Sequence, residues 1–187
     1  MTSNTSTERH GPTPAFSGPT VALHRPQIPQ NTGNISRLCV AINSPLVLTG
    51  KIGFDFSSSA VKRAGLDHWE HLQFRNFSRF KEFCAFAGKR RIVAVTKAAH
   101  TSALDFDYQA DDILLFGNET MGLPPTLLKR LPHQVQIPMW GPVRSLNLSN
   151  SVAVVAYAHI RRVYGADLAH SAADFPRTYF RGKNDIR

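Results

Sequence analysis

The 187-residue sequence predicts a single α/β domain with helices on both faces of a mostly parallel β-sheet. Short apolar runs alternate along the chain with segments whose apolar residues have helical spacing. Two of these runs, residues 92–96 and 113–116, are continuously apolar, which is typical of central parallel strands buried on both faces. Because ligands of such sheets bind beyond the carboxyl ends of the strands, we expect function in the loops that follow them.

The domain is predicted to begin with a strand, a helix and a second strand. Residues 20–23 and 46–49 are short apolar strands. The helix begins at Thr32 or Gly33 and is stopped by Pro45. Its predicted buried face, at helical spacing, consists of Ile35, Leu38, Cys39 and Ile42.

A short helix and an edge strand are predicted to follow, over residues 57–64 and 71–74. The next helix begins after Ser78, a favoured N-cap residue, and ends at Gly88.

Beyond the two continuously apolar strands, prolines open a predicted helix over residues 124–131, and residues 135–139 form a last strand. The final helix covers residues 148–164. Its first turns, residues 152–158, are apolar on every side, so we expect them to be buried.

The composition favours a soluble protein that binds a polyanion. Lys and Arg number 22 against 13 acidic residues, giving a net charge of +9 and a pI near 10.1. Nucleic acid is the commonest polyanionic partner, although a basic protein without such a partner remains an alternative. The basic residues are spread along the chain, which fits a folded basic face better than a disordered arm. The longest apolar stretch is far too short to span a bilayer, so no membrane role is expected.

The two cysteines, Cys39 and Cys84, both lie in apolar helical patterns. We expect buried free thiols in a reducing compartment, hence a cytoplasmic protein. Neither cysteine has a neighbour at ligand spacing, and His68 and His71 have no third ligand nearby, so no metal site is expected.

The ends of the chain differ in composition from its middle. Residues 1–19 are rich in Ser, Thr, Pro and Gly and lack the apolar run of a secretory signal, which predicts a flexible leader. Residues 20–164 are the predicted folded domain, and residues 165–187 form a basic tail.

The loop after residues 113–116 reads GNETMG and is bracketed by Gly117 and Gly122. It is not a phosphate-binding P-loop, because Leu-Pro follows where Lys-Ser/Thr would be required, and the chain has no GxGxxG fingerprint. The glycines let the backbone approach a ligand closely, with Glu119 beside it. A structural turn with a solvated Glu119 is the alternative.

The loop PMWGPVRSLNLSNS gathers three hydroxyls and two amides at the start of the last helix. One or two such groups suffice to cap a helix, so the surplus favours a polar ligand. Ser145 is no hydrolytic nucleophile, because it lacks the GxSxG elbow.

The first loop and helix, RPQIPQNTGNISR, bring together Asn31, Asn34 and Arg37. Asn34 and Arg37 are three residues apart and therefore share one helical face. Helix amides and an arginine fork can bind a phosphate, while a capped helix with one exposed arginine is the common alternative.

Three segments in this order resemble the SPOUT (SpoU–TrmD) RNA methyltransferases, most of all the TrmL-type tRNA 2'-O-methyltransferases. They are PQIPQNTGNISRLC, LLFGNETMGLP and IPMWGPVRSLNLSNSVAVV, and the intervening VKRAGLDHWE also resembles that subfamily. The resemblance covers residues 21–164.

The resemblance implies an α/β fold with a C-terminal trefoil knot, an exception to ordinary chain topology. It implies S-adenosyl-L-methionine as methyl donor, no metal, and tRNA as substrate, methylated on the ribose of wobble nucleotide 34, cytidine or uridine, in the anticodon stem-loop. It also implies a homodimer in which the partner's first segment completes each active site. The implied cofactor-binding residues are Val95, Gly117, Glu119, Gly122, Ile137, Ser145 and Leu146, and the implied catalytic residues are Arg37, Asn34 and Asn147.

The sequence departs from the subfamily at several points. Asn118 replaces the usual proline of Gly-Pro-Glu, Gln30 replaces a frequent proline, the loop after Val95 is one residue shorter, and Trp140-Gly141 is bulkier and more flexible than usual. These changes bear on substrate choice more than on methyl transfer. Methylation of another tRNA or rRNA nucleotide, a non-catalytic RNA-binding module and a small-molecule methyltransferase remain alternatives.

Because the guanidinium of free arginine has a pKa above about 12, Arg37 is a poor base. Our hypothesis is that Arg37 binds the 2'-hydroxyl together with the adjacent phosphate, which helps to accept the proton.

Overall fold

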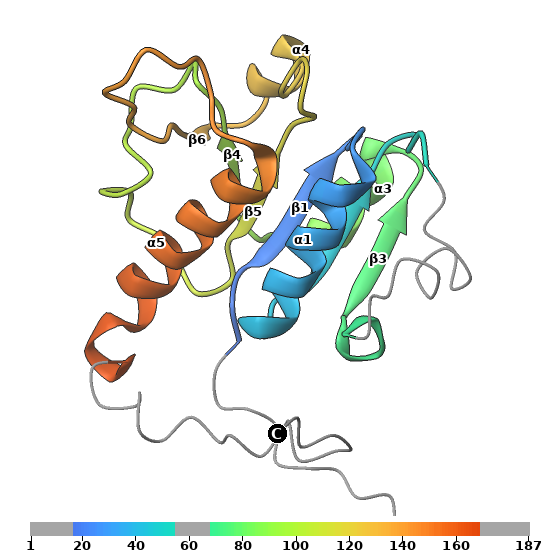
Figure 1. Ribbon diagram of the computed structural model, residues 1–187, viewed down its shortest axis with the longest axis horizontal. Coiled ribbons are helices and arrows are strands. Elements are labelled where there is room, and N and C mark those ends of the chain that lie inside the picture. Colours follow the sequence, from blue (N-terminus) through green and yellow to red (C-terminus); the bar gives the residue numbers. More distant parts are fainter. Residues whose placement is uncertain (1–16, 55–67, 169–187) are drawn as a thin grey trace, which may run out of the picture.

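A computed structural model describes residues 17–54 and 68–168 of the chain (Figure 1). Within these residues, six strands form one parallel sheet in the order β3-β2-β1-β5-β4-β6. The predicted α/β fold class is therefore confirmed. The strand order reverses between β1 (Thr20–His24) and β5 (Ile113–Phe116), which are neighbours in the sheet. Such a reversal is where open parallel sheets bind their ligands.

The central strands agree with the sequence-based expectation to within one residue, because their apolar runs are buried on both faces. The elements in chain order are β1, α1 (Pro29–Ala41), β2 (Leu46–Thr49), η1 (Trp69–His71), β3 (Phe74–Phe77), α3 (Phe80–Ala87), β4 (Ile92–Val95), β5, α4 (Pro125–Leu128), β6 (His133–Val135) and α5 (Leu148–Leu168).

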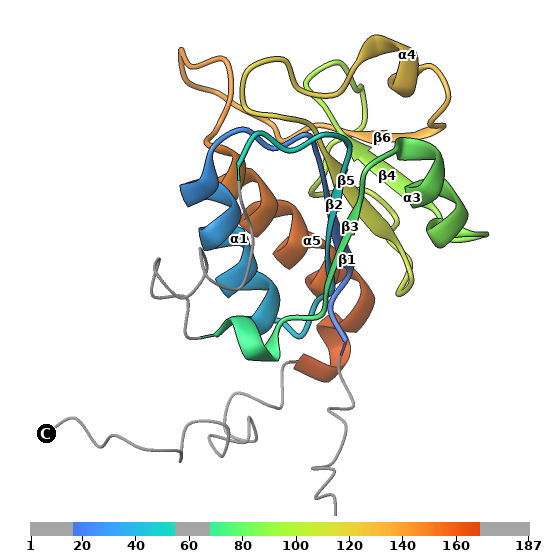
Figure 2. The same ribbon diagram turned by 90° about the vertical axis from the view of Figure 1, so that its right-hand side faces the viewer.

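Helices cover both faces of the sheet, as predicted (Figure 2). Helices α1 and α5 pack against each other on one face, where Val21 and Leu23 of β1 point into the larger core. Helices α3 and α4 lie on the opposite face, where Ala22 packs near Phe83 in a second core. The alternation of side chains along β1 thus supplies both cores from a single strand.

Helix α1 begins at Pro29, one turn before the predicted start at Thr32 or Gly33. A proline is tolerated in the first turn of a helix because the amide it lacks would have had no partner there. The earlier start places Asn31 inside the helix, buried at its amino end.

The two cysteines differ in their environment. Cys39 on α1 is a buried free thiol, as predicted, and burial raises its pKa. Cys84 is a free but exposed thiol, so its predicted burial is wrong. Helix α3 buries Phe83 and Ala87, which are four residues apart, and the same helical turn directs Cys84 outward.

Strand β3 lies at Phe74–Phe77 instead of the predicted residues 71–74. The segment Trp69–His71 is a 3₁₀ turn that precedes it. Because β3 is an edge strand, it exposes Arg75 and Asn76. These polar residues interrupt the apolar run that would have predicted the strand.

Strand β6 lies at His133–Val135, so the predicted strand over residues 135–139 is misplaced. After Val135 the chain leaves β4, because the backbone of Gln136 pairs with the segment between β4 and β5. Gln136 donates its N–H to the carbonyl of Thr101 at 2.9 Å, and its own carbonyl accepts from Ala103 at 2.7 Å. Pro138 has no amide with which to continue a strand.

Helix boundaries were predicted less well than the central strands. Helix α3 has Arg79 as its N-cap in place of Ser78, and α4 is shorter than the predicted residues 124–131. Helix α5 extends to Leu168, past the predicted end at residue 164. Within residues 152–158, which were expected to be buried, Val154 and Tyr157 are exposed.

The predicted helix over residues 57–64, the leader up to residue 16 and the tail after residue 168 lie outside the described residues. In the part that is described, no helix combines the length and apolar character needed to cross a membrane.

A buried ion pair joins the start of β5 to the start of β4. Asp112 is fully buried and accepts two bonds from Arg91, at 2.8 Å from Nε and 2.7 Å from Nη2. It also accepts a bond from the backbone of Gln109 at 2.9 Å. A bidentate arginine–carboxylate pair of this kind depends on both partners, because removal of one leaves a buried charge without compensation.

We expect Asp112→Ala to lower the free energy of unfolding by about 3–5 kcal/mol, as is usual when one partner of a buried pair is removed. The control is Asp107→Ala, which removes the exposed pair with Arg162 and should cost under about 1 kcal/mol. Urea denaturation followed by circular dichroism measures both. Equal losses in the two variants would contradict the structural role of Asp112.

Candidate functional site

A cavity of about 570 Å³ opens at the carboxyl edge of the sheet. The loops that follow β4, β5 and β6 line it, and Ile28 and Asn31 at the start of α1 complete the wall. Since α1 follows β1, residues after both strands at the reversal point contribute to one cavity. This is the position at which the sequence led us to expect a site.

The loop after β5 is folded tightly on itself. A Cβ atom at Gly117 would overlap the backbone of Gly122 and Leu123, so any larger residue would force the loop apart. Gly122 has a φ of 67°, a left-handed conformation that favours glycine. The side chain of Asn118 fixes the turn by accepting a hydrogen bond from the backbone of Met121 at 2.7 Å. The loop therefore forms one compact wall of the cavity, to which every residue from 117 to 123 contributes.

The carboxylate of Glu119 binds the amino end of α1. It accepts hydrogen bonds from the backbone N–H groups of Gln27 at 2.9 Å and Ile28 at 3.1 Å, and from Nδ2 of Asn31 at 3.0 Å. The N-cap residue of α1 makes no capping bond with its own side chain. Glu119 thus supplies from another loop the negative charge that the amino end of a helix favours.

The hydrogen bonds to Glu119 determine its protonation. Burial alone would raise its pKa, but the bonds from Asn31, Gln27 and Ile28 outweigh burial and place the pKa below its usual range. The group is therefore ionised in neutral solution.

Asn147 links the same helix to α5. Its Nδ2 donates to Oδ1 of Asn31 at 2.9 Å, and its Oδ1 accepts from the backbone N–H of Ser149 at 2.8 Å. The second bond is that of an N-cap, which satisfies an amide at the start of α5. Glu119, Asn31 and Asn147, which we call the loop clamp, connect the loops after β1, β5 and β6 by hydrogen bonds.

The cavity combines an apolar floor with amide, hydroxyl and backbone groups, as small-molecule sites usually do. Phe116, Leu123 and Ile137 are among its apolar residues. Its charged residues are Lys97, Glu119 and Arg144. Since Glu119 is engaged by α1, the charges left for a ligand are positive. The cavity can hold a ligand with an apolar body and several polar groups, one of them anionic.

All the residues predicted to bind a cofactor line this one cavity. They are Val95, Gly117, Glu119, Gly122, Ile137, Ser145 and Leu146, and Asn147 joins them.

Two of the predicted catalytic residues lie elsewhere. Asn34 and Arg37 share an exposed face of α1, as their spacing predicted, but neither lines the cavity of its own chain. Gln30 and Ala41 lie on the same exposed face, which faces away from the sheet.

Sequence reasoning did not assign Lys97 and Arg144 to the site, and it grouped Asn31 only with a phosphate-binding arrangement. Their positions in segments that follow strands at the carboxyl edge were the available signal. His68, interpreted as a surface residue, is half-buried and forms a 2.8 Å hydrogen bond with Ser36. Among the described residues, no three His, Cys, Asp or Glu side chains gather into a group that could hold a metal.

The chain is similar to RNA methyltransferases. Residues 18–157 match the SpoU rRNA Methylase family. A tRNA (cytidine(34)-2'-O)-methyltransferase of Aeromonas hydrophila is 38% identical over 145 residues, covering 76% of this chain and 93% of that protein.

Solved structures agree with the sequence matches. One, described as structural insights into the 2-OH methylation of C/U34 on tRNA, superposes with a TM-score of 0.74 at 40% identity and covers 79% of this chain and 97% of that one. Another is the SpoU methyltransferase AviRb of Streptomyces viridochromogenes in complex with AdoMet, with a TM-score of 0.65 at 26% identity, covering 79% of this chain and 58% of that one.

We expect Glu119→Gln to destabilise the protein at neutral pH by about 1 kcal/mol, less than is usual for a charge-assisted bond because the group is partly exposed to solvent. The folded-state pKa lies below the unfolded value near 4.5, so this contribution is complete above that pH and is lost as the pH falls through the folded pKa. Urea denaturation between pH 3 and 7, with the exposed Glu70→Gln as control, measures the difference. A wild-type advantage that does not shrink in acid would contradict the proposed charge.

Proposed function

The chain belongs to the SpoU rRNA methylase family, and on that premise we propose that it methylates the ribose 2'-hydroxyl of wobble nucleotide 34, cytidine or uridine, in tRNA. The observation that carries the proposal is the single cavity formed by all the predicted cofactor-binding residues at the strand reversal. Relatives and a solved structure named for this reaction at 38% and 40% identity support the choice of nucleotide.

The cavity fits S-adenosyl-L-methionine as the methyl donor. Its volume suits a ligand of that size, and Gly117 in its lining lets the loop turn back closely on Gly122 and Leu123. Apolar residues such as Ile137 suit the adenine ring, while Ser145 and neighbouring amides suit the polar groups. When bound, the cofactor supplies an electrophilic methyl group on a sulfonium.

Arg37 is proposed as the catalytic residue, with Asn34 and Asn147 in supporting roles. Since Arg37 lies on an exposed face of α1, we propose a homodimer in which Arg37 of one chain reaches the cavity of the other. The exposed Val154 and Tyr157 on α5 support a partner surface beside α1. In this arrangement the Arg37 guanidinium binds the 2'-hydroxyl and the adjacent phosphate, which helps to take up the proton as the oxygen accepts the methyl group. Holding the oxygen in line supplies much of the rate.

We also propose that this fold contains the C-terminal trefoil knot that the family resemblance implies. Residues 136–147 leave the sheet edge, pair with the segment after β4 at Thr101 and Ala103, and return to α1 through Asn147.

We also propose that the protein acts in the cytoplasm, which suits the free thiol of Cys39.

Incubation of the purified protein with S-adenosyl-L-methionine and unmodified tRNA transcripts, followed by mass mapping, tests the proposed reaction. We expect one added methyl group on the ribose of nucleotide 34. Methylation at another tRNA or rRNA position would contradict the proposed specificity. Binding of RNA without any methyl transfer would favour a non-catalytic RNA-binding module instead.

We expect Gly117→Ala to abolish binding of S-adenosyl-L-methionine in calorimetry, because the added methyl group overlaps the loop backbone that faces the cavity. Gly53→Ala is the matched control, since a Cβ there meets nothing within 4 Å. Wild-type affinity in Gly117→Ala would show that the cofactor does not use this loop.

We expect Arg37→Ala to lose methyl transfer while binding the cofactor normally, and Arg79→Ala, on the other face of the sheet, to remain active. Mixed dimers of Arg37→Ala and Gly117→Ala chains should recover about a quarter of wild-type activity, because half the dimers then hold one intact cavity facing one intact Arg37. If Arg37 acts within its own chain, no mixture recovers activity, and that outcome would contradict the shared site.

A further inference from the structure

Trp140 is the most exposed of the large apolar side chains in the described part of the protein, with 88% of its surface accessible. It lies in the loop between β6 and α5, and no aromatic ring of the described residues packs against it. The same loop exposes other apolar side chains, namely Met139 (37%), Val143 (59%) and Leu146 (38%). Contiguous exposed apolar residues of this kind mark a surface that binds something.

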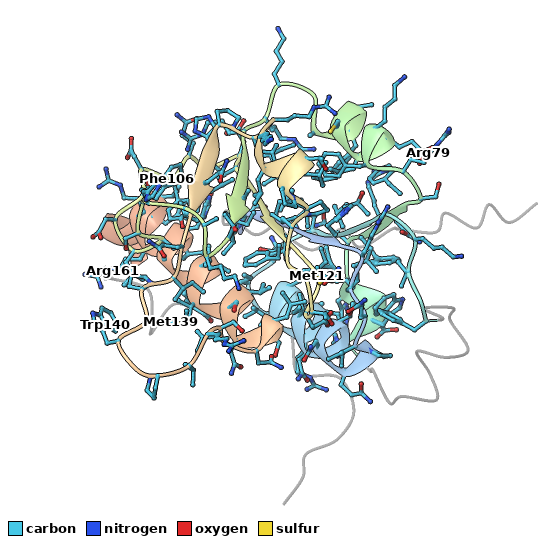
Figure 3. The ribbon with its side chains drawn as sticks, turned by 90° about the horizontal axis from the view of Figure 1, so that it is seen from above. Arg79, Phe106, Met121, Met139, Trp140 and Arg161 are labelled. Carbon is cyan, nitrogen blue, oxygen red and sulfur yellow. The ribbon has the colours of Figure 1, made fainter. Side chains whose placement is uncertain are left out.

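The position of Trp140 relates it to the cavity. Met139, which precedes it, and Arg144, which follows it, both line the cavity, while Trp140 itself stands outside the lining. Figure 3 shows Trp140 directed away from the molecule at its edge, beside Met139, with Met121 nearer the centre. The indole therefore stands on the outer side of the loop that lines the cavity, which we call the rim, exposed to a macromolecule that places one of its groups in the cavity.

The charge of the rim favours a nucleic acid over another protein surface. The loop over residues 136–147 contains Arg144 and no acidic residue. Lys97 contributes a second exposed positive charge to the lining. An exposed aromatic ring next to cationic side chains is the usual means of binding unpaired nucleotides, since every base has a face on which it can stack.

We propose that Trp140 is a stacking platform for an unpaired base adjoining the nucleotide that enters the cavity. This inference rests on the proposed function and adds a substrate-positioning residue that does not touch the reacting atoms. It requires the RNA to be single-stranded at the rim, as an anticodon loop is. The competing occupant is a second copy of this chain, in whose interface the indole would be buried.

The kinetic test compares Trp140→Ala, Trp140→Phe and wild type, with an anticodon stem-loop RNA as substrate. Loss of one base–aromatic stack should raise KM about 5- to 150-fold in Trp140→Ala with little change in kcat. Trp140→Phe keeps an aromatic face and should retain most of the affinity. Affinity for S-adenosyl-L-methionine, measured by calorimetry, should be the same in all three. An unchanged KM in Trp140→Ala would overturn the proposal.

Fluorescence gives a second readout that does not depend on catalysis. The chain has two tryptophans, and Trp69→Phe leaves Trp140 as the single indole while keeping an aromatic ring against Phe74. With S-adenosylhomocysteine present to prevent turnover, titration with the stem-loop should quench this fluorescence to saturation. A fully paired duplex containing the same sequence should quench it much less, and equal quenching by the two RNAs would overturn the proposal.

Sedimentation velocity separates the two occupants. If Trp140→Ala dissociates an oligomer that wild type forms, Trp140 belongs to an interface between copies, and the stacking proposal is overturned. The proposed function fails separately. If wild type methylates no tRNA, yet the stem-loop quenches Trp140 in the Trp69→Phe variant, the reaction is overturned and the stacking role is supported.

Discussion

The loop clamp is the interaction on which the site depends. Parallel strands bring loops to one edge of a sheet, but those loops are remote in sequence and have no backbone ladder to hold them together. Here a carboxylate from the loop after β5 binds the amino end of α1, and the amide of Asn31 continues the connection to Asn147. Glu119 also accepts from the backbone at the start of α1, and Asn147 accepts from the backbone of Ser149 at the start of α5. The side chains that join the loops therefore also serve the helix starts. A cavity for a ligand remains between them.

The sequence predicted the centre of the sheet better than its edges. A strand such as β5, buried on both faces, is apolar throughout, so its pattern alone identifies it. Edge strands have no such requirement. Arg75 and Asn76 face solvent from β3, and His133 and Gln134 begin β6 at the other edge, so both strands were misplaced. The exposed Tyr157 on α5 shows a related limit, because an apolar pattern does not reveal whether the face is covered by the same chain or by another.

The sequence predicted which residues line the candidate site better than it predicted what each of them does there. Tight turns favour glycine, so the glycines at positions 117 and 122 could be recognised in the sequence. The structure shows the steric reasons, which are backbone overlap at position 117 and a positive φ at position 122. The hydrogen-bond partners of Glu119 and Asn147 depend on which loops lie side by side in the fold. Those loops are far apart in the sequence, so a local sequence pattern does not identify the partners. The separation of Arg37 from the cavity has the same origin. In the homodimer that we propose, its position on one chain acquires a function when a second chain is brought against α1.

A double-mutant cycle on the two ends of the loop clamp tests this account most directly. Glu119→Gln, Asn147→Ala and the double variant are compared with wild type in calorimetric binding of S-adenosyl-L-methionine. Glu119 and Asn147 both bind Asn31, so loss of either releases the same amide. We predict a coupling of about 0.5–3 kcal/mol, with the double variant losing less affinity than the sum of the single losses. Additive losses would contradict the claim that one connected set of hydrogen bonds assembles the cavity.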